Sequence, residues 1–290
     1  MSRLEKKTVS ALKRARDLIC AVPNRIRYKR GLAHSRLETA PPRLTTPTFL
    51  GHETLRLADE CVSSTADIPI DEIWSRHFAW GGRYFGAYDY WETRVLCGLI
   101  RKFRVDNVVE CSPNQGWSTL FMRLARPLKS HVSFDIEDFE GAIRSKLRDY
   151  GVERGWEFVL GDFRRKGLEY VRRIEDADVL FIDADHRLDF AVWYMETFKI
   201  LDVVKPGCLV HIHDIYPQGK EPPSPDFGES PYIVDFLSRN RGRFDILFNY
   251  EMCRQEQFQS KYPKNFFLNH FGAQAHNPSV WFVKSLSQNV

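Results

Sequence analysis

The sequence predicts an α/β fold: a doubly wound, mostly parallel sheet of seven strands with helices on both faces. From about residue 105 onwards, short apolar runs alternate with helical patterns, and nearly every apolar run ends in an acid or a histidine. Alternating strands and helices form right-handed crossovers, which make the strands parallel and cover the sheet on both sides. Five such units followed by two late strands give seven strands.

Each element has its own pattern. The five apolar runs are "VDNVVEC", "HVSFDIED", "WEFVLGDF", "ADVLFIDADH" and "GCLVHIHDIY". We expect helices at 116–127, up to Tyr150, over "RRKGLEYVRRI", over 188–198 and around 232–238. Two late strands, "RFDILFNYE" and "PSVWFVKS", complete the pattern. The last strand could enter antiparallel, because only a loop precedes it.

The chain divides into a basic N-terminal extension with a linker, residues 1–75, and an α/β domain, residues 76–290. Residues 1–36 hold eleven Lys and Arg against Glu5 and Asp17, and "APPRLTTPTF" has the prolines of an extended linker. The basic arm could contact an anionic membrane surface, an acidic polymer or a partner. It could equally be a solvated helix whose charge maintains solubility.

Composition excludes several classes of protein. Of the 290 residues, 43% are hydrophobic and 13% aromatic, which is enough for a packed core. No apolar run reaches the roughly 18 residues of a membrane span, and the N-terminus lacks the apolar segment of a signal peptide. A cytoplasmic location is therefore expected. The six cysteines are scattered without a C-x-x-C pair, which argues against a disulfide scaffold and a structural zinc site.

Acids and histidines follow each of the first five strands. An open α/β sheet binds ligands at the carboxyl ends of its strands, so these side chains should gather on one edge. A single acid after a strand is commonly a helix N-cap, but five such positions favour a binding site for hydroxyls, amines or a cation. In chain order they are Glu110, Asp135, Glu137, Asp162, Asp183, Asp185, His186, His213 and Asp214.

The first turn, "CSPNQG", lacks the three glycines that a pyrophosphate requires, and the chain has no phosphate-binding P-loop. A cofactor with hydroxyls and a positive charge but no phosphate fits better. "VVECSPNQGWST", "SFDIED" and "LGDF" resemble the first three motifs of the class I S-adenosylmethionine-dependent methyltransferases, whose fold is Rossmann-like. The resemblance covers about residues 105–285. One departure is Ser112, which stands where that family usually has glycine.

The resemblance implies a role for each matching residue. Glu110 would act near the methionine end of the cofactor through the loop, and the backbone from Ser112 to Gly116, with Ser118 beyond it, would line the amino-acid portion. Asp135, with Glu137 in reserve, would hold the ribose. Asp162 would meet the adenine amino group.

"FIDADH" and "HIHDIY" further resemble the sugar O-methyltransferases of the macrocin type and relatives described as cephalosporin-hydroxylase-like. That likeness implies His186 as general base. It also implies Asp183, in contact with cofactor and acceptor, and Asp214 as ligands of a divalent metal, with His213 as a third. Mg²⁺ suits the two acids better than the histidine.

We therefore expect a methyltransferase that uses S-adenosylmethionine to modify a hydroxyl of a sugar or glycan, with Mg²⁺ as a candidate metal. We expect carbohydrate modification and no nucleic-acid partner. The aromatic run "FAWGGRYFGAYDYW" supplies acceptor candidates in Trp80, Tyr84 and Tyr88, although aromatics more often simply pack. The loop 217–231 could select the acceptor. Two alternatives stay open: a non-catalytic cofactor-binding protein of the same fold, and a hydroxylase with iron held by His186, His213 and Asp214.

Overall fold

The computed structural model describes residues 52–78, 90–184, 187–213, 229–240, 243–248 and 279–284. Several predicted features lie outside these ranges. They are the basic arm, the linker, most of the aromatic run, His186, Asp214 and most of the loop 217–231.

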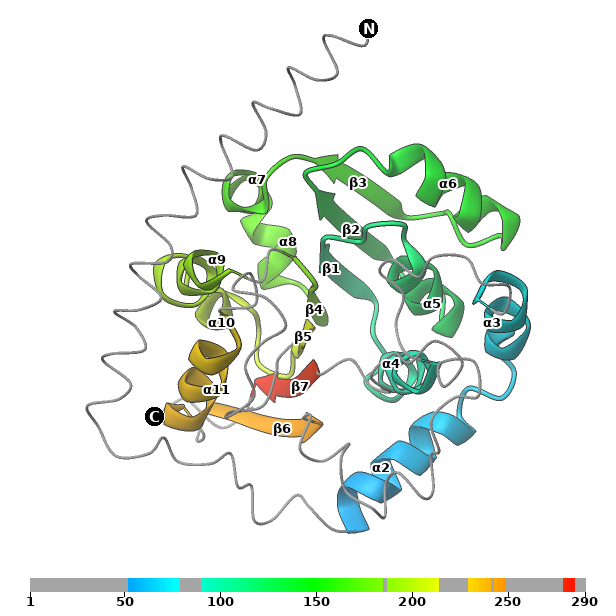
Figure 1. Ribbon diagram of the computed structural model, residues 1–290, viewed down its shortest axis with the longest axis horizontal. Helices are drawn as coiled ribbons and strands as arrows, with labels where there is room; N and C mark the ends of the chain where they lie inside the picture. Colours follow the sequence, from blue (N-terminus) through cyan, green and yellow to red (C-terminus); the bar gives the residue numbers. More distant parts are fainter. Residues whose placement is uncertain are drawn as a thin grey trace, which may run out of the picture.

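The fold is built on one sheet with the strand order β3-β2-β1-β4-β5-β7-β6 (Figure 1). Five strands are parallel, which confirms the predicted α/β class: β1 (Asn107–Cys111), β2 (Ser130–Asp135), β3 (Trp156–Leu160), β4 (Val179–Ile182) and β5 (Leu209–His213). At the far side, β7 (Ser279–Lys284) is antiparallel to β5 and to β6 (Phe244–Phe248). Strand order reverses between β1 and β4, which makes their carboxyl ends the expected ligand site.

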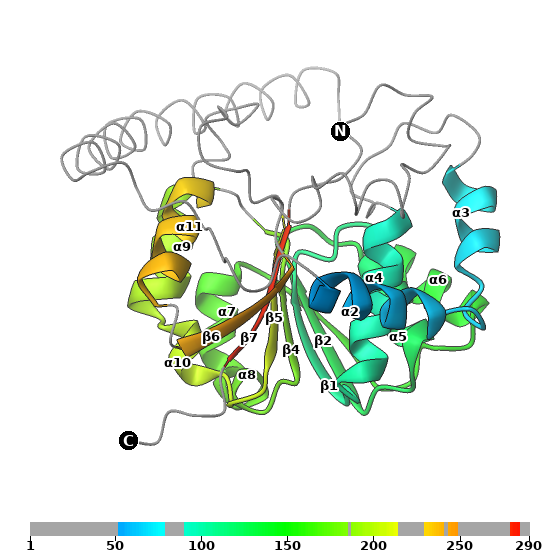
Figure 2. The same ribbon diagram turned by 90° about the horizontal axis from the view of Figure 1, so that it is seen from below.

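Helices cover both faces of this sheet (Figure 2). One layer contains α2 (His52–Ser63), α3 (Ile70–Phe78), α4 (Tyr90–Lys102), α5 (Trp117–Ala125) and α6 (Glu140–Asp149). The other contains α7 (Phe163–Glu169), α8 (Val171–Glu175), α9 (Leu188–Val192), the π-helix η1 (Trp193–Thr197), α10 (Ile200–Val203) and α11 (Glu229–Arg239). No helix in the described ranges is long and apolar enough to cross a membrane.

Two hydrophobic cores lie on the two sides of the sheet, and alternation along the strands assigns residues to them. In β1, Val108 packs into the core beneath α4 and α5, whereas Val109 and Cys111 face the core beneath α9 and α10. The four described cysteines, Cys61, Cys97, Cys111 and Cys208, are buried free thiols, as expected for small apolar residues.

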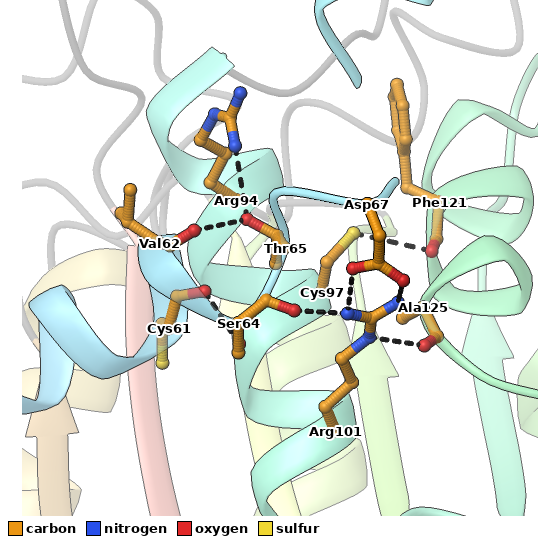
Figure 3. A network of polar contacts seen from close by, with 10 residues as sticks. All are labelled: Cys61, Val62, Ser64, Thr65, Asp67, Arg94, Cys97, Arg101, Phe121 and Ala125. Atoms are coloured by element: carbon orange, nitrogen blue, oxygen red, sulfur yellow. Dashed lines mark hydrogen bonds and ion pairs between the residues drawn. The ribbon is translucent and has the colours of Figure 1, made fainter. Parts of the chain in front are cut away.

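The helices α2 and α3 are integral to the first core. Arg101 of α4 binds both carboxylate oxygens of Asp67, at 2.5 and 2.9 Å, and its Nε donates to the carbonyl of Ala125 at 2.7 Å. The same guanidinium donates to the carbonyl of Ser64, so one side chain joins α4, α5 and the α2–α3 connection (Figure 3). Five side chains of α2, α3 and their connection are buried in the same core as α4 and α5: Cys61, Ile68, Ile70, Ile73 and Trp74.

The predicted boundary between residues 75 and 76 falls inside α3, whose residues Ile70, Ile73 and Trp74 belong to the first core. The division of the chain into an extension and a domain stays a prediction.

The crossing of α2 over α4 depends on Gly98. A Cβ at this position would lie 2.4 Å from both Cα and Cβ of Cys61, closer than atoms can approach. Alanine normally stabilises a helix relative to glycine by about 1 kcal/mol. Here the backbone clash reverses that sign, and α2 can only move away.

We expect Gly98→Ala to lower the free energy of unfolding by about 1–3 kcal/mol, because overpacking forces the two helices apart. Gly141→Ala is the matched control, since a Cβ at Gly141 of α6 meets no atom within 4 Å. The control should be neutral or stabilising by up to about 1 kcal/mol. Urea denaturation of both variants measures the difference, and equal effects would refute the close crossing.

Candidate functional site

Three of the predicted acids, Asp135, Asp162 and Asp183, lie near the carboxyl end of β1. The register places Cys111 beside Phe134 of β2 and Ile182 of β4, so these strands end at the same level. The pKa of the Cys111 thiol is raised far above its usual value, first by burial and then by the charges of Asp135, Asp162 and Asp183. The carboxylates at the ends of β2, β3 and β4 are therefore all close enough to Cys111 to raise the pKa of its thiol.

The turn between β1 and α5 has left-handed backbone conformations at two residues that are not glycine. Ser112 has φ +65° and Asn114 φ +49°, both in the left-handed region that glycine adopts most easily. Asparagine tolerates this conformation, but serine does so at a cost. The turn is anchored to β2, since the N–H of Ser112 donates to the carbonyl of Phe134 at 2.7 Å.

Gly116 is required on two independent grounds. It has φ +76° and immediately precedes α5, as expected for the residue that opens this helix. A Cβ there would lie 2.7 Å from Cγ1 of Ile143 on α6. The turn and α6 are therefore in direct contact.

Glu110 does not face the edge at all. Its carboxylate is fully buried between β1, β2 and α5, and accepts hydrogen bonds from Ser118 at 2.5 Å and Thr119 at 2.7 Å. Ser133, directly opposite in β2, donates at 2.7 Å, and Nε2 of His131 lies 3.0 Å away. Any effect of Glu110 on a ligand must pass through α5.

Electrostatics at this buried position favour the ionised acid. Burial alone would raise the pKa of Glu110, but the hydrogen bond and charge of His131, with the bonds from Ser118 and Thr119, lower it below its usual value. Because Ser118 donates inward to Glu110, its hydroxyl proton is not directed at the edge. Sequence reasoning missed His131, Thr119 and Ser133, which carry no local signal of this role.

Asp135 joins β2 to the β1–α5 turn. Its two oxygens accept from the N–H of Asn114 at 3.1 Å and of Glu137 at 3.0 Å. Burial raises the pKa of Asp135 above its usual value, although these backbone bonds oppose the shift. The N–H of Ile136 also lowers this pKa, and a carboxylate with about four acceptor sites keeps room for a further hydrogen bond beyond these three. Glu137 is exposed, and between the two acids Ile136 exposes 73% of its surface at the same edge.

Asp162 is the N-cap of α7, accepting from the N–H of Arg164 at 2.9 Å. The guanidinium of Arg164 also binds this carboxylate, with Nη2 2.8 Å from Oδ2. Burial opposes ionisation, but the bonds from Arg164 prevail and lower the pKa of Asp162. The carboxylate of Asp162 is therefore already bound by Arg164 and is not free to meet an adenine amino group. In this structure Asp162 has the role of a helix N-cap, which is the alternative expected for an acid after a strand.

Asp183 and His213 form a pair at the ends of neighbouring strands. Nδ1 of His213 lies 3.0 Å from Oδ1 of Asp183, with the imidazole buried and the carboxylate partly exposed. Within the part of the chain that the structure describes, no group of three His, Cys, Asp or Glu is placed to hold a metal ion. The two described candidate ligands face each other, and an imidazole suits Mg²⁺ poorly, so this pair does not fit a magnesium site.

The comparisons with known proteins give this edge its context. A family model described as a methyltransferase domain matches residues 109–215, from β1 to just beyond β5. Residues 109–215 are therefore similar to a methyltransferase domain. The matched segment spans all five parallel strands, so every acid of the edge lies within or next to it. A comparison with curated proteins found no significant match.

Solved structures share the architecture of this chain. The O-methyltransferase TomG from Streptomyces achromogenes, involved in tomaymycin synthesis and solved with S-adenosylmethionine, has 15% identity and a TM-score of 0.50, covering 81% of this chain and 100% of its own. A candidate caffeoyl-CoA O-methyltransferase from Staphylococcus aureus has 12% identity and a TM-score of 0.50, covering 80% and 99%. At these identities the likeness shows the Rossmann-like fold.

The strained turn between β1 and α5 yields a prediction. Ser112→Gly should raise the free energy of unfolding by up to about 1 kcal/mol, because glycine adopts φ +65° without strain. Ser112→Ala, which keeps the strain and removes the hydroxyl, is the matched control and should show no gain. Chemical denaturation distinguishes them. Equal stability of the two variants would mean that the turn is unstrained.

Proposed function

We propose that this protein transfers the methyl group of S-adenosylmethionine to a hydroxyl oxygen. The observation that carries the proposal is the acid-lined edge at the reversal of strand order, within a segment matched by a methyltransferase family model. This edge offers carboxylates and backbone amides. It suits a cofactor that has hydroxyls and a positive charge but lacks phosphate.

The cofactor would lie across the ends of β1, β2 and β3. The backbone of residues 112–116 would line its methionine end, and Asp135 would accept the ribose hydroxyls through its remaining lone pairs. Ile136 offers an apolar surface beside that acid, and Glu137 stays in reserve. For Asp162 to meet the adenine amino group, Arg164 would have to release it.

Methyl transfer needs little covalent help from the protein. The acceptor oxygen attacks the methyl carbon, the carbon–sulfur bond breaks, and its electron pair stays on sulfur to give S-adenosylhomocysteine. The acceptor must also lose its proton, which a positioned base can take. By resemblance this base is His186, which follows β4 in the chain. The hydrogen-bonded pair Asp183–His213 at the ends of β4 and β5 would orient the acceptor beside it.

We further propose a sugar or glycan as the acceptor, on two sequence features. The strand-end sequences "FIDADH" and "HIHDIY" resemble the macrocin-type branch, and the aromatic run 78–91 offers faces that suit sugar rings. A screen of glycan, phenolic and small-alcohol acceptors with methyl-labelled cofactor tests this part separately. Labelling of phenols alone would refute the sugar proposal and leave methyl transfer standing.

Cofactor binding is tested at Asp135. Asp135→Asn should weaken binding of S-adenosylmethionine by about 10- to 100-fold, because hydrogen bonds to a charged acceptor contribute about 1.5–3 kcal/mol. Calorimetric titration measures the affinity, and Glu175→Gln is the control, since Glu175 is an exposed acid at the end of α8, just before the amino end of β4. Absence of binding by the wild-type protein would end the proposal.

The base is tested at His186. His186→Ala should leave the affinity for S-adenosylmethionine unchanged and reduce turnover by about 100-fold or more, because general base catalysis typically contributes that much. Turnover is measured with an acceptor from the screen, with and without EDTA. Undiminished turnover would remove His186 from the role, and loss with EDTA that Mg²⁺ restores would require a metal. Binding without turnover on any acceptor would favour the non-catalytic alternative.

A further inference from the structure

Lys146 of α6 is placed against the turn that would bind the cofactor. Its Nζ lies 3.8 Å from the centre of the Trp117 ring, and it donates a hydrogen bond to the carbonyl of Gln115. Gln115 belongs to the turn, and Trp117 is the first residue of α5. One ammonium therefore holds the chain on both sides of Gly116.

The same face of α6 makes a second contact with the turn. Ile143, three residues before Lys146, fills the space where Gly116 has no side chain. The Trp117 ring also contacts His77 of α3, with ring centres 4.9 Å apart. The turn is thus braced from α6 over three consecutive residues, and α3 contacts the same ring.

These contacts are needed because the residues of the turn do not by themselves favour its backbone conformation. Ser112 and Asn114 both adopt positive φ, so local preferences favour other conformations at two of its positions. Hydrogen bonds to β2 fix its first half, through the N–H groups of Ser112 and Asn114. Lys146 fixes its second half.

We propose that Lys146 is a positioning residue for the cofactor, fixing the backbone of residues 112–116 through Gln115 and Trp117. The inference rests on the proposed function, because the methionine end of S-adenosylmethionine would lie on that backbone. Lys146 itself contacts the turn and the tryptophan ring. It acts on the cofactor through them.

The position of Lys146 also gives the contact a dependence on pH. Burial lowers the pKa of Lys146 from 10.5 to about 8, and within the ranges that the structure describes no carboxylate offsets that burial. Of the groups on neighbouring elements, His77 of α3 senses the charge of Lys146, and Arg76 acts on the same imidazole. Burial and these two charges lower the pKa of His77, which leaves Lys146 as the cation on the tryptophan ring.

A rise in pH should change the stability of the fold and the affinity for the cofactor in opposite directions. Because folding lowers this pKa, the buried ammonium destabilises the fold below about pH 8, and this effect disappears as the pH rises towards 10.5. The contacts with Gln115 and Trp117 use the charged form. Cofactor affinity should therefore fall as the pH rises through about 8, where Lys146 of the folded protein loses its charge, while the stability of the fold does not fall.

The test is a calorimetric titration of the full-length protein with S-adenosylhomocysteine. Lys146→Met should weaken binding by about 3- to 30-fold, as expected for loss of a partly buried cation–π contact. Lys146→Arg keeps the cation and the donor and should restore most of the affinity. The control is Lys129→Met, because Lys129 is exposed and pairs with Asp106 next to the amino end of β1. That variant should bind as the wild type does.

A comparison of about pH 7 with about pH 9 completes the experiment, because the ratio of wild-type to Lys146→Met affinity cancels the titration of the ligand itself. This ratio should shrink towards one at the higher pH. Equal affinity of wild type and Lys146→Met, or a loss that Lys146→Arg does not restore, would overturn the proposal. Failure of the wild type to bind would instead refute the proposed function.

Discussion

The structure of the candidate site depends on one buried carboxylate. Glu110 has no solvent to stabilise its charge, so it must be satisfied by donors from its surroundings, which are Ser118, Thr119, Ser133 and His131. Two of these donors begin α5 and two belong to β2. The cost of burying the charge therefore fixes α5 against the sheet at one register. The turn between β1 and α5 has to close within that geometry, whatever its own conformational preferences.

This constraint explains the form of the turn. With both ends fixed, five residues must connect β1 to α5, and Ser112 and Asn114 take left-handed conformations to do so. The deficit of glycine that stands out in "CSPNQG" is thus compensated from outside. Asp135 and the carbonyl of Phe134 hold the first half, whereas Ile143 and Lys146 of α6 hold the second. A loop of this kind gains rigidity from its neighbours rather than from its sequence.

The sequence allowed the fold to be predicted further than the site. Apolar runs at regular spacing located the five parallel strands, because burial on both faces leaves a strong local pattern. The meeting of Asp135, Asp162 and Asp183 followed from topology alone. What could not be predicted was where each side chain points and what it binds. Glu110 turns inward because alternation along β1 places it beneath α5, and Asp162 binds a guanidinium two residues away. His131 and Lys146 contact the site from helices and strands distant in the chain, so no local pattern marks them.

The row of acids raised a physical question, since like charges gathered at one edge repel each other. The described residues answer it with partners from the chain itself. Asp135 takes two backbone amides, Asp162 takes Arg164, and Asp183 takes the imidazole of His213. Both oxygens of Asp135 are bound by neutral backbone N–H groups, and the carboxylate can accept a further hydrogen bond beside them. A ligand can add to Asp135 without displacing anything, whereas at Asp162 it must compete with a charged group. In the proposed binding mode, with the ribose on Asp135 and the adenine near Asp162, most of the affinity would come from the ribose end of the cofactor, and the adenine would be selected weakly while Arg164 stays on Asp162.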